Sequence, residues 1–506
     1  MASPSPFLAC SPPTHVVEYE SFGAQGDGVT DDLPAICAAH QFANARGLPV
    51  RSRPDATYHL GRRALTAEIA TDTDWNSSRF IVDDVRAEDR RTPLFEVCSH
   101  LEPIELPIHS LQRDQKHLGI EPGRDCYVHV EDDRRRRYIR RGPNRNRGRG
   151  QCDNFIVRAD GAIDSPIDWD YDRFSSIEIR PIDPVTLKLR GGVFTTIANR
   201  IKQERGYSYW SRNIIVRRSN TEVEGLAHHV TGETDVGQPY SGFLRILRCA
   251  DVTLRDCFAS GHRIYRTMGN ADTPVAMGSY DYVAKEVTNL RMLGCRMDRI
   301  HDRNLWGVIA TDFCRNILLE DCVLSRMDTH MGVSGFYTIR DCTLGHMGLN
   351  AIGRGRLTIE NATIHGDRLI RFRGDYGSTW EGELIIRNCR WIPGRGNRTQ
   401  QFVVGVSNDG MHDFGYPCTM PRQIVIDGLI VDDADAPDEY EGLYLLTDPD
   451  ILENVSDSPQ LPDLRPYPYT CCKQVIVKNL TTTSGKSARL SPSQRVAAQV
   501  QWIGGD

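Results

Sequence analysis

Side chains that could transfer protons or hold an anion gather in short segments between residues 280 and 380. Most of these segments combine histidine, aspartate, arginine and aromatic residues within a few positions of one another. They hold Tyr280, Asp281, Tyr282 and Lys285; Arg299, His301, Asp302 and Arg303, ahead of Trp306; Arg326, Asp328 and His330; His346, Arg354 and His365; and Arg373, Asp375 and Tyr376, ahead of Trp380. Chemistry on carbohydrates uses this set of side chains.

β-Elimination from an acidic polysaccharide is one reaction that these residue types could perform. Arg373 or Arg354 would neutralise a uronate through two parallel hydrogen bonds and so make its C5 proton more acidic. His330 would abstract that proton, with Asp328 orienting the imidazole. This interpretation predicts that the four side chains share one site.

Glycoside hydrolysis is the other reaction. Asp328 and Asp375, or Asp302 in place of one of them, would be the acid and the nucleophile or base, and their separation would predict inversion or retention. Under either reaction, aromatic rings would stack on sugar faces while polar groups hold the chain. The predicted substrate-binding residues are Arg354, His301, Asp302, Arg326, Tyr376, Trp380 and His346.

The same residues also have purely structural interpretations. Asp328 and His330 could satisfy backbone groups in a turn. Arg373 and Asp375 could form a surface ion pair, which contributes little by itself. Against the first of these, Arg326, Asp328 and His330 would all project to one side of an extended strand, which favours a shared site.

A short phrase recurs through the same part of the chain. It consists of β-forming residues, a polar pair that includes Asp or Asn, and usually a cysteine, as in the copies Ile317–Cys322, Tyr337–Cys342, Leu357–Asn361 and Leu384–Cys389, with earlier copies ending at Cys257 and Cys295. The shortest spacing, near 20 residues, predicts a parallel β-helix whose coils stack about 4.8 Å apart. Asp or Asn would turn the chain. The cysteines would form a buried ladder, because free Cys behaves as a small buried hydrophobe.

A β-helix has no hollow interior, so a site must lie on its outer face, between the strands of successive coils. Residues 20 or more positions apart can then contact the same sugar. We therefore expect Asp328, His330, Arg354, Arg373 and Asp375 to converge on one exposed groove.

Bulk composition excludes several classes of protein. The chain has 506 residues and a formal net charge of −6, which implies no global attraction to nucleic acid. No run of 18 apolar residues exists, so no membrane span is expected. The first ten residues lack a basic region and a full apolar core, so we expect no signal peptide. The 15 cysteines do not demand an oxidising compartment.

We expect one solenoid with local additions. The predicted parts are a flexible tail (1–14), a capping strand and helix (15–60), the β-helix (61–482) with insertions near 131–150 and 432–468, and a C-terminal tail (483–506). The segment 134–150 holds nine arginines in seventeen residues. A polyanion contact is one interpretation. We expect instead a solvent-facing connection outside the catalytic groove.

The sequence predicts no cofactor and no metal site. Asp432 and Asp433 could ligate Ca²⁺, but no D-x-D-x-D-G loop supports a calcium site. Oligomeric state and compartment are left open.

Two stretches resemble a known superfamily. The run Y-E-S-F-G-A-Q-G-D-G-V-T-D-D from Tyr19 to Asp32, followed by an apolar helical segment, is similar to the opening of pectate-lyase-like proteins. The runs Asp328–Val333, Thr343–Gly353 and Asp375–Trp380 resemble a subgroup found among bacterial and phage-associated surface proteins. The resemblance implies an all-β, single-stranded, right-handed parallel β-helix with an N-terminal capping helix, in a secreted or surface-associated protein. The subgroup comes with no well-defined reaction, so the resemblance assigns no catalytic residues. The fingerprints of polygalacturonases and mannuronan epimerases are missing from the sequence.

Three functions follow as expectations. The first is an enzyme that cleaves an acidic polysaccharide, by β-elimination or hydrolysis, in a groove on the outer face. The second is a non-catalytic glycan-binding or tailspike-like adhesin, and the third is a purely structural solenoid. We expect residues 483–506 to be too short for a trimer-forming assembly region, which favours the enzyme.

Overall fold

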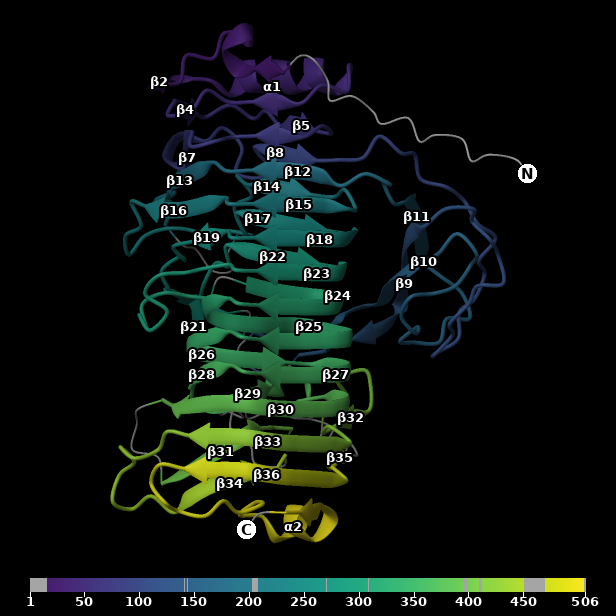
Figure 1. Cartoon of the computed structure of the whole chain (residues 1–506), viewed down its shortest axis with the longest axis vertical. Helices are drawn as coiled ribbons and strands as arrows, with labels where there is room; N and C mark the ends of the chain where they lie inside the picture. The colour runs from purple at the N-terminus through teal and green to yellow at the C-terminus, as the bar shows by residue number, and fades with distance from the viewer. Residues whose placement is uncertain are drawn as a thin grey trace, which may run out of the picture.

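The computed structural model describes residues 16–504 except 141, 143, 203–207, 270, 308, 395–398, 409–411 and 450–468. The predicted tail at 1–14 and residues 450–468 of the predicted insertion at 432–468 therefore lie outside the described residues. Within the described part of that predicted insertion, Gly442–Leu446 form a strand of the stack, β34, which pairs in parallel with β31 (Gln400–Gly405). The described chain winds into parallel strands stacked along one long axis, with its beginning and end at opposite ends of the stack (Figure 1). This arrangement is a parallel β-helix, as the sequence repeat predicts.

The main sheet of the stack is parallel and carries the repeated phrase. Its later strands are β17 (Leu244–Leu247), β18 (Ala250–Arg255), β22 (Tyr282–Lys285), β23 (Thr288–Leu293), β24 (Ile309–Glu320), β25 (Val323–Arg340), β26 (Thr343–Ala351), β27 (Gly353–Glu360), β28 (Thr363–Gly366), β29 (Arg368–Phe372), β30 (Trp380–Pro393), β31 (Gln400–Gly405), β33 (Gln423–Val431), β34 (Gly442–Leu446), β36 (Gln474–Thr482) and β37 (Gln501–Ile503). Its earlier strands are β1 (Val17–Glu18), β3 (Val50–Arg51), β5 (Ala67–Ile69), β6 (Thr73–Asp74), β8 (Phe95–Val97), β12 (Leu187–Arg190), β14 (Ile214–Val216) and β15 (Thr221–Glu224).

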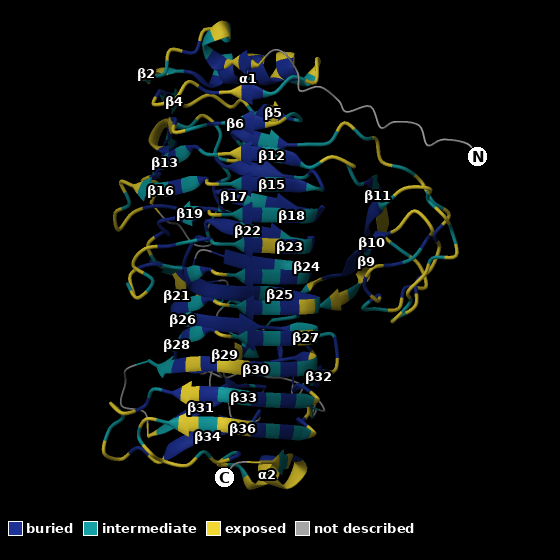
Figure 2. Cartoon of the chain, viewed as in Figure 1, coloured by how far each residue is buried: buried dark blue, intermediate teal, exposed yellow. Residues whose placement is uncertain are grey.

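Equivalent residues of the repeat stand in register from coil to coil. Leu319 on β24 pairs with Ile339 on β25, which pairs with Ile359 on β27 and then Ile386 on β30. All four are buried in one continuous core. Each coil covers the apolar face of its neighbour, which is how a solenoid builds a core without a globular interior. In Figure 2 the strands of the stack are largely buried, and the exposed residues concentrate in loops.

The polar residue of the phrase turns the chain as predicted. Asp321, Asp341, Asn361 and Asn388 all have φ near +50°. That is the left-handed conformation that Asp and Asn tolerate better than other non-glycine residues. The residues that follow these turns point inward: Cys257, Cys295, Cys322, Cys342 and Cys389 are buried free thiols. The backbone amide of Cys322 lies 3.4 Å from the sulfur of Cys342, so the predicted buried ladder is confirmed.

At the N-terminal end, α1 (Leu33–Asn44) begins with Pro at its first turn and buries Leu33, Ile36, Ala39 and Ala43 in the main core. A second parallel sheet begins beside it and consists of β2 (Asp27–Asp31), β4 (Thr57–Leu60), β7 (Arg79–Asp83), β13 (Val193–Ile197), β16 (Ala227–Thr231) and β19 (Phe258–Ala259). Short 3-10 turns occur at Tyr19–Phe22 and Asp84–Arg86.

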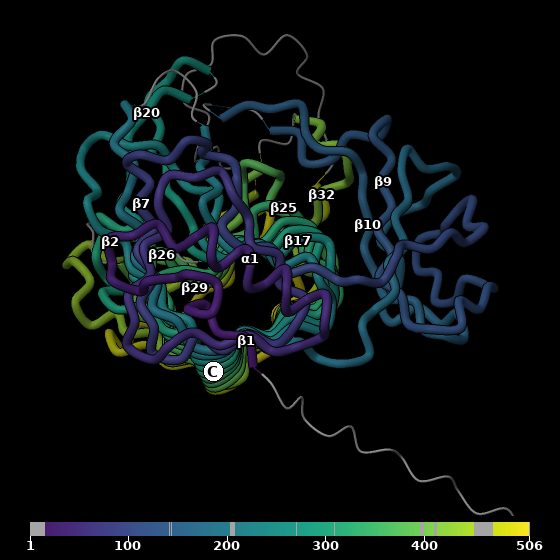
Figure 3. Tube along the Cα trace, turned by 90° about the horizontal axis from the view of Figure 1, so that it is seen from above, coloured from purple at the N-terminus to yellow at the C-terminus, as the bar shows by residue number. Residues whose placement is uncertain are grey.

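The insertion is larger than predicted. Between β8 and β12 the chain leaves the stack and forms an antiparallel sheet of β9 (Cys126–Arg137), β10 (Arg149–Val157) and β11 (Ser176–Pro181). This sheet has its own core, which includes Val128, Phe155 and Ile179. It projects from one side of the stack in Figure 1 and in the axial view of Figure 3. The segment predicted as an isolated connection is the tip of a folded subdomain.

The end of the chain also differs from the predicted tail. Residues 483–506 contain α2 (Gln494–Gln499) and β37, and β37 pairs in parallel with β36. Two further strand pairs complete the described structure: antiparallel β20 (Tyr265–Met268) with β21 (Pro274–Met277), and parallel β32 (Cys418–Thr419) with β35 (Tyr469–Thr470). None of the described helices has the length and apolar character needed to cross a membrane.

Candidate functional site

Neighbouring coils bring three of the predicted catalytic residues together. Asp328 lies on β25, and Arg373 and Asp375 lie at the start of the 3-10 turn η3 (Gly374–Tyr376), which follows β29. Arg373 Nη1 donates to both carboxylate oxygens of Asp328 at 2.9 Å. Its Nε and Nη2 donate to Asp375 at 3.0 and 2.7 Å. One guanidinium therefore joins two carboxylates that are 47 residues apart in the sequence.

Asp328 is fully buried and saturated with donors. Besides Arg373, it pairs with Arg326 Nη2 at 2.9 Å and accepts hydrogen bonds from Asn350, at 3.1 Å, and from the Tyr280 hydroxyl. Burial alone would raise the pKa of the Asp328 carboxyl, but Arg326 and Arg373 outweigh burial and hold that pKa well below its usual range. Asp328 is therefore ionised at neutral pH and enclosed by protein.

Asp375 receives a second cation from the insertion. Arg140, at the tip of the β9–β10 hairpin, lies 2.8 Å from its carboxylate. Burial raises the pKa of Asp375, but Arg373 and Arg140 together hold it well below the usual range. The prediction that the arginine run stays outside the groove is therefore wrong at Arg140.

His330 is the accessible member of the group, with 34% of its side chain exposed. Its Nδ1 lies 3.2 Å from Asp312 Oδ1 on β24, which is ion-pair distance, and its ring meets Tyr376 edge-on at 5.7 Å. The predicted orienting residue, Asp328, is occupied elsewhere, and Asp312 takes that place. Imidazole–carboxylate contacts are often imperfectly aligned in the absence of substrate. The arrangement is a half-exposed imidazole backed by a carboxylate and a buried ring.

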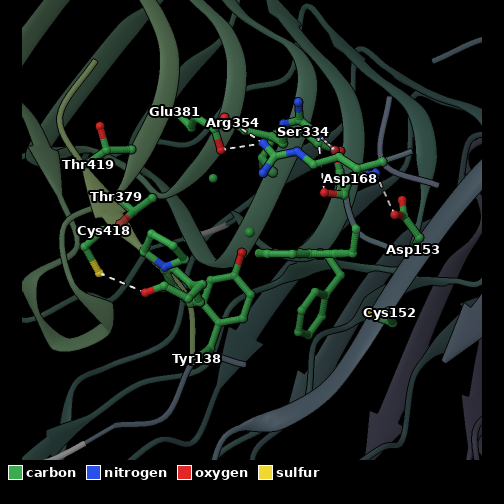
Figure 4. A pocket seen from close by; sticks show the side chains of 18 of the residues that line it. Tyr138, Cys152, Asp153, Asp168, Ser334, Arg354, Thr379, Glu381, Cys418 and Thr419 are labelled. Carbon is green, nitrogen blue, oxygen red and sulfur yellow. Dashed lines mark hydrogen bonds and ion pairs between the residues drawn. The ribbon is translucent and has the colours of Figure 1, made fainter. Parts of the chain in front are cut away.

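Arg354 does not converge on this group. It faces the insertion, where Nη2 lies 2.9 Å from Asp114 and Nη1 lies 3.3 Å from Asp168. It lines a cavity of about 320 Å³ between the insertion and the stack, together with Arg113, Tyr138, Trp169 and Glu381. Figure 4 shows Arg354 and Asp168 beside each other at this cavity, with Tyr138 and Cys418 also lining it. The expectation of one groove for all five residues is wrong for Arg354.

The cavity and the His330 group nevertheless share a wall. Tyr138 lines the cavity and packs edge-on against Phe313, at 5.3 Å, and Tyr376, at 6.0 Å. Gly332, two residues after His330, has φ of +44°, and a Cβ there would lie 2.2 Å from the Tyr138 hydroxyl. Only glycine lets the insertion approach β25 so closely.

A third group contains His301, Asp302, His346 and His365. The rings of His301 and His365 meet at 4.3 Å, and His346 Nδ1 lies 3.1 Å from the Ile300 carbonyl oxygen. Asp302 accepts hydrogen bonds from the backbone and side chain of Asn304, which help to lower its pKa. Among the described residues, no hydrogen bond, ion pair or ring contact joins this group to Asp328 or His330.

Two aromatic residues predicted to bind the substrate, Trp380 and Tyr376, are buried and cannot stack on a sugar. Trp380 is fully buried, packs on Phe372 and Tyr337, and its indole N–H lies 3.2 Å from the carbonyl oxygens of Gly355 and Glu383. It is a core residue of β30. Tyr376 is also buried and supports His330 from behind. Arg326, 9% exposed, lies beneath Trp306 and Tyr280. It positions Asp328 rather than facing solvent.

Sequence reasoning missed Asp312, Asn350 and Arg140. Asn350 pairs directly with Asp328 across β25 and β26, so the repeat register could have found it. Asp312 stands at a shift in the register between β24 and β25. Arg140 comes from the insertion. Within the described residues, this site assembles no three ligand atoms of His, Cys, Asp or Glu close enough to hold an ion.

The chain is similar to proteins of bacteriophages. No family model matches the sequence. The KL64-specific capsule depolymerase of Klebsiella phage P510 is 34% identical over 94 residues, which cover 16% of this chain and 9% of that protein. The tailspike protein gp49 of Pseudomonas phage LKA1 aligns with a TM-score of 0.57 at 14% identity, over 96% of this chain and 84% of that one. The tailspike gp61 of Pseudomonas phage phi297 gives a TM-score of 0.47 at 13% identity, over 96% and 83% of the two chains.

The likeness to gp49 extends over nearly the whole chain and concerns the fold. It agrees with the parallel pairing of successive coils and with the aligned columns of the core. The predicted resemblance to the pectate-lyase-like parallel β-helix proteins is thereby confirmed at the level of the fold.

Proposed function

We propose that this protein cleaves an acidic polysaccharide by β-elimination, with His330 accepting the proton from C5 of a uronate. The C4=C5 double bond forms as the C4–O bond breaks, and the departing oxygen takes a proton from water. The observation that carries the proposal is the half-exposed imidazole of His330 held against Asp312, beside carboxylates that arginines keep ionised. A histidine backed by a carboxylate can transfer protons near neutral pH. The short match to a capsule depolymerase of a Klebsiella phage is consistent with a polysaccharide substrate.

The electrostatics of the three carboxyls predicted for hydrolysis, Asp328, Asp375 and Asp302, favour elimination over hydrolysis by these residues. A glycosidase needs one carboxyl group whose pKa is raised so that it can donate a proton at neutral pH. The pKa values of Asp328 and Asp375 are lowered by their arginine partners, and the pKa of Asp302 is lowered by hydrogen bonds from Asn304. None of these three carboxyls is suited to be the general acid. His330 needs no such partner to act as a base.

The uronate would require a cation other than Arg373, whose donors are engaged by Asp328 and Asp375. Arg371 fits this role because it is exposed and no described residue forms an ion pair with it. The register pairs Asp328 with Asn350 and Asn350 with Arg371, so Arg371 stands two coils from Asp328 in the same column. We assign charge neutralisation to Arg371 in place of Arg373 or Arg354.

Glycan binding without cleavage is the second candidate, and the cavity beside the insertion favours it. Arg113, Arg354, Glu381, Trp169 and Tyr138 line a space of about 320 Å³ with charged and aromatic groups. Such a mixture binds sugars through hydrogen bonds and ring contacts and requires no proton transfer. In that case the cavity holds the glycan, and His330 has no catalytic role.

Incubation with a panel of acidic polysaccharides tests the proposal. Elimination produces unsaturated uronates that absorb in the ultraviolet, whereas hydrolysis produces reducing ends without that absorbance. We expect both signals to rise together on one substrate. Reducing ends alone would identify a hydrolase, and binding to a polysaccharide that stays intact would identify an adhesin.

A further inference from the structure

A second polar cluster lies inside the stack, away from the proposed catalytic group. His228 lies on β16, His262 follows β19, and Asp281 immediately precedes β22. At most 1% of each of these three side chains is exposed. Apolar surroundings make such a set costly unless its members satisfy one another or bind something. The proposed reaction uses none of them.

The three side chains aim at a common point. One ligand atom from each lies within 4.8 Å of the other two. Nδ1 of His228 hydrogen-bonds Oδ1 of Asp281, and Nε2 of His262 lies 3.9 Å from the same oxygen. The other carboxylate oxygen of Asp281, Oδ2, is buried and has no hydrogen-bond partner among the described residues. One oxygen of the Asp281 carboxylate is therefore buried without a donor, while the other oxygen contacts the two imidazoles.

Surrounding groups fix the orientation of both imidazoles. Glu233 Oε1 lies 2.9 Å from Nδ1 of His262, and Glu233 is itself held by the Tyr265 hydroxyl at 2.8 Å and the Arg263 amide at 3.0 Å. A carboxylate on one ring nitrogen sets the tautomer and directs the other nitrogen's lone pair inward, as it does for histidines that bind metals. His228 stacks flat on Phe243 at 3.8 Å, and its Nε2 lies 2.9 Å from Thr196 Oγ1.

We propose that His228, His262 and Asp281 bind one divalent transition-metal ion, with Zn²⁺ as the best match. Two imidazoles and a carboxylate suit Zn²⁺ and its first-row neighbours, whereas Ca²⁺ and Mg²⁺ prefer oxygen ligands alone. Coordination through Nδ1 of His228 uses the tautomer protonated at Nε2, which then donates to Thr196 Oγ1. The ion takes the place of the His228–Asp281 hydrogen bond and satisfies Oδ2 of Asp281.

The site is structural in this proposal. Its ligands come from consecutive parts of the winding chain, at residues 228, 262 and 281, so one ion cross-links the coils that carry them. Metal affinity for such a site appears as folding stability, because the unfolded chain does not preform it. The ligands are enclosed, so the ion is expected to enter during folding and to exchange slowly afterwards.

The test is metal content after folding in the presence of the ion. The full chain is produced in medium supplemented with Zn²⁺, or refolded with Co²⁺, and then dialysed against a weak chelator. We expect about one ion per chain by elemental analysis, visible absorption bands for Co²⁺ in a protein site, and a thermal midpoint several degrees above that of protein refolded with EDTA. Asp281→Asn and His262→Gln should lose the ion and its thermal effect.

His40→Gln is the matched control, because His40 is also a buried histidine and hydrogen-bonds Tyr19 at the N-terminal end. It should keep about one ion per chain. Folded wild-type protein that retains neither Zn²⁺ nor Co²⁺ would overturn the proposal without recourse to any variant. Equal metal content in wild type and Asp281→Asn would overturn it as well, because the ion would then lie elsewhere.

Discussion

Replacing Arg373 with methionine tests how the candidate site is held together. Methionine keeps much of the length and apolar volume of the side chain but removes every donor. In the wild type this guanidinium makes four hydrogen bonds of 2.7–3.0 Å to two carboxylates. The Arg373 side chain is 13% exposed and Asp328 is completely buried. Loss of Arg373 therefore leaves the buried carboxylate of Asp328 with less compensating positive charge.

The expected loss of stability depends on which cations remain beside Asp328 and Asp375. Removing one partner of a buried ion pair typically costs about 3–5 kcal/mol, because an uncompensated charge is left behind. Asp328 keeps Arg326 at 2.9 Å, and Asp375 keeps Arg140 at 2.8 Å. We therefore expect the low end of that range, about 3 kcal/mol in the free energy of unfolding. The matched control is Arg356→Met, which breaks an exposed pair with Glu383 at 3.1 Å and should cost less than about 1 kcal/mol.

Urea denaturation, followed by circular dichroism, measures both variants. A double-mutant cycle with Asp375→Asn isolates the Arg373–Asp375 contact, and we expect a coupling free energy of about 1 kcal/mol or more. If Arg373→Met unfolds at the same urea concentration as Arg356→Met, the carboxylates of Asp328 and Asp375 do not depend on this arginine. The electrostatic argument against hydrolysis would then lose its basis.

Three further outcomes follow from the same structure. In the folded protein the pKa values of Asp328 and Asp375 lie below their usual range, so the unfolded chain takes up more protons as the pH falls below about 4. The thermal midpoint should therefore be constant near neutral pH and fall on acidification. An unchanged thermal midpoint down to pH 3 would contradict this. Trp380→Ala should lower the free energy of unfolding by about 3–5 kcal/mol, because it leaves a cavity in the core. If the variant instead binds glycan more weakly at unchanged stability, Trp380 is an exposed sugar-stacking residue and not a core residue. Arg315 is 2% exposed and contacts Asp153 and Asp168 of the insertion, so Arg315→Met should make residues 99–182 susceptible to limited proteolysis while the stack stays intact; a resistant insertion would show that other contacts hold it.

The coil repeat was predictable because its chemistry is local. Each Asp or Asn with positive φ turns the chain, and the next residue enters the core, so spacing alone gave the register from Cys257 to Cys389. That register also brings Asp328 and Arg373, 45 residues apart, into contact. The role of Trp380 was predictable too, since Trp380, Leu384 and Ile386 share the inward parity of β30. The prediction that Trp380 stacks on a sugar relied on the residue type and ignored its inward-facing position on the strand.

The remaining differences have physical causes outside the repeat. A register shift between Thr311 and Asp312 brings Asp312 next to His330, and spacing gives no sign of that shift. The insertion has its own apolar core and contacts the stack through ion pairs between residues far apart in the sequence. Arg354 therefore meets Asp114 and Asp168 rather than the groove, and Arg140 meets Asp375. Contacts between an inserted subdomain and a solenoid depend on three-dimensional docking, which a one-dimensional repeat does not encode.

The most direct test of the central claim compares initial rates of unsaturated uronate formation by wild type and His330→Gln, on the polysaccharide that wild type cleaves. The control is His59→Gln, since His59 is another partly exposed histidine, 4.0 Å from Asp83 and near the N-terminal end. Loss of the base should lower the rate of His330→Gln by about 10²–10⁴-fold with its thermal midpoint unchanged, while His59→Gln stays within a few-fold of wild type. A His330→Gln rate within a few-fold of wild type would contradict the account.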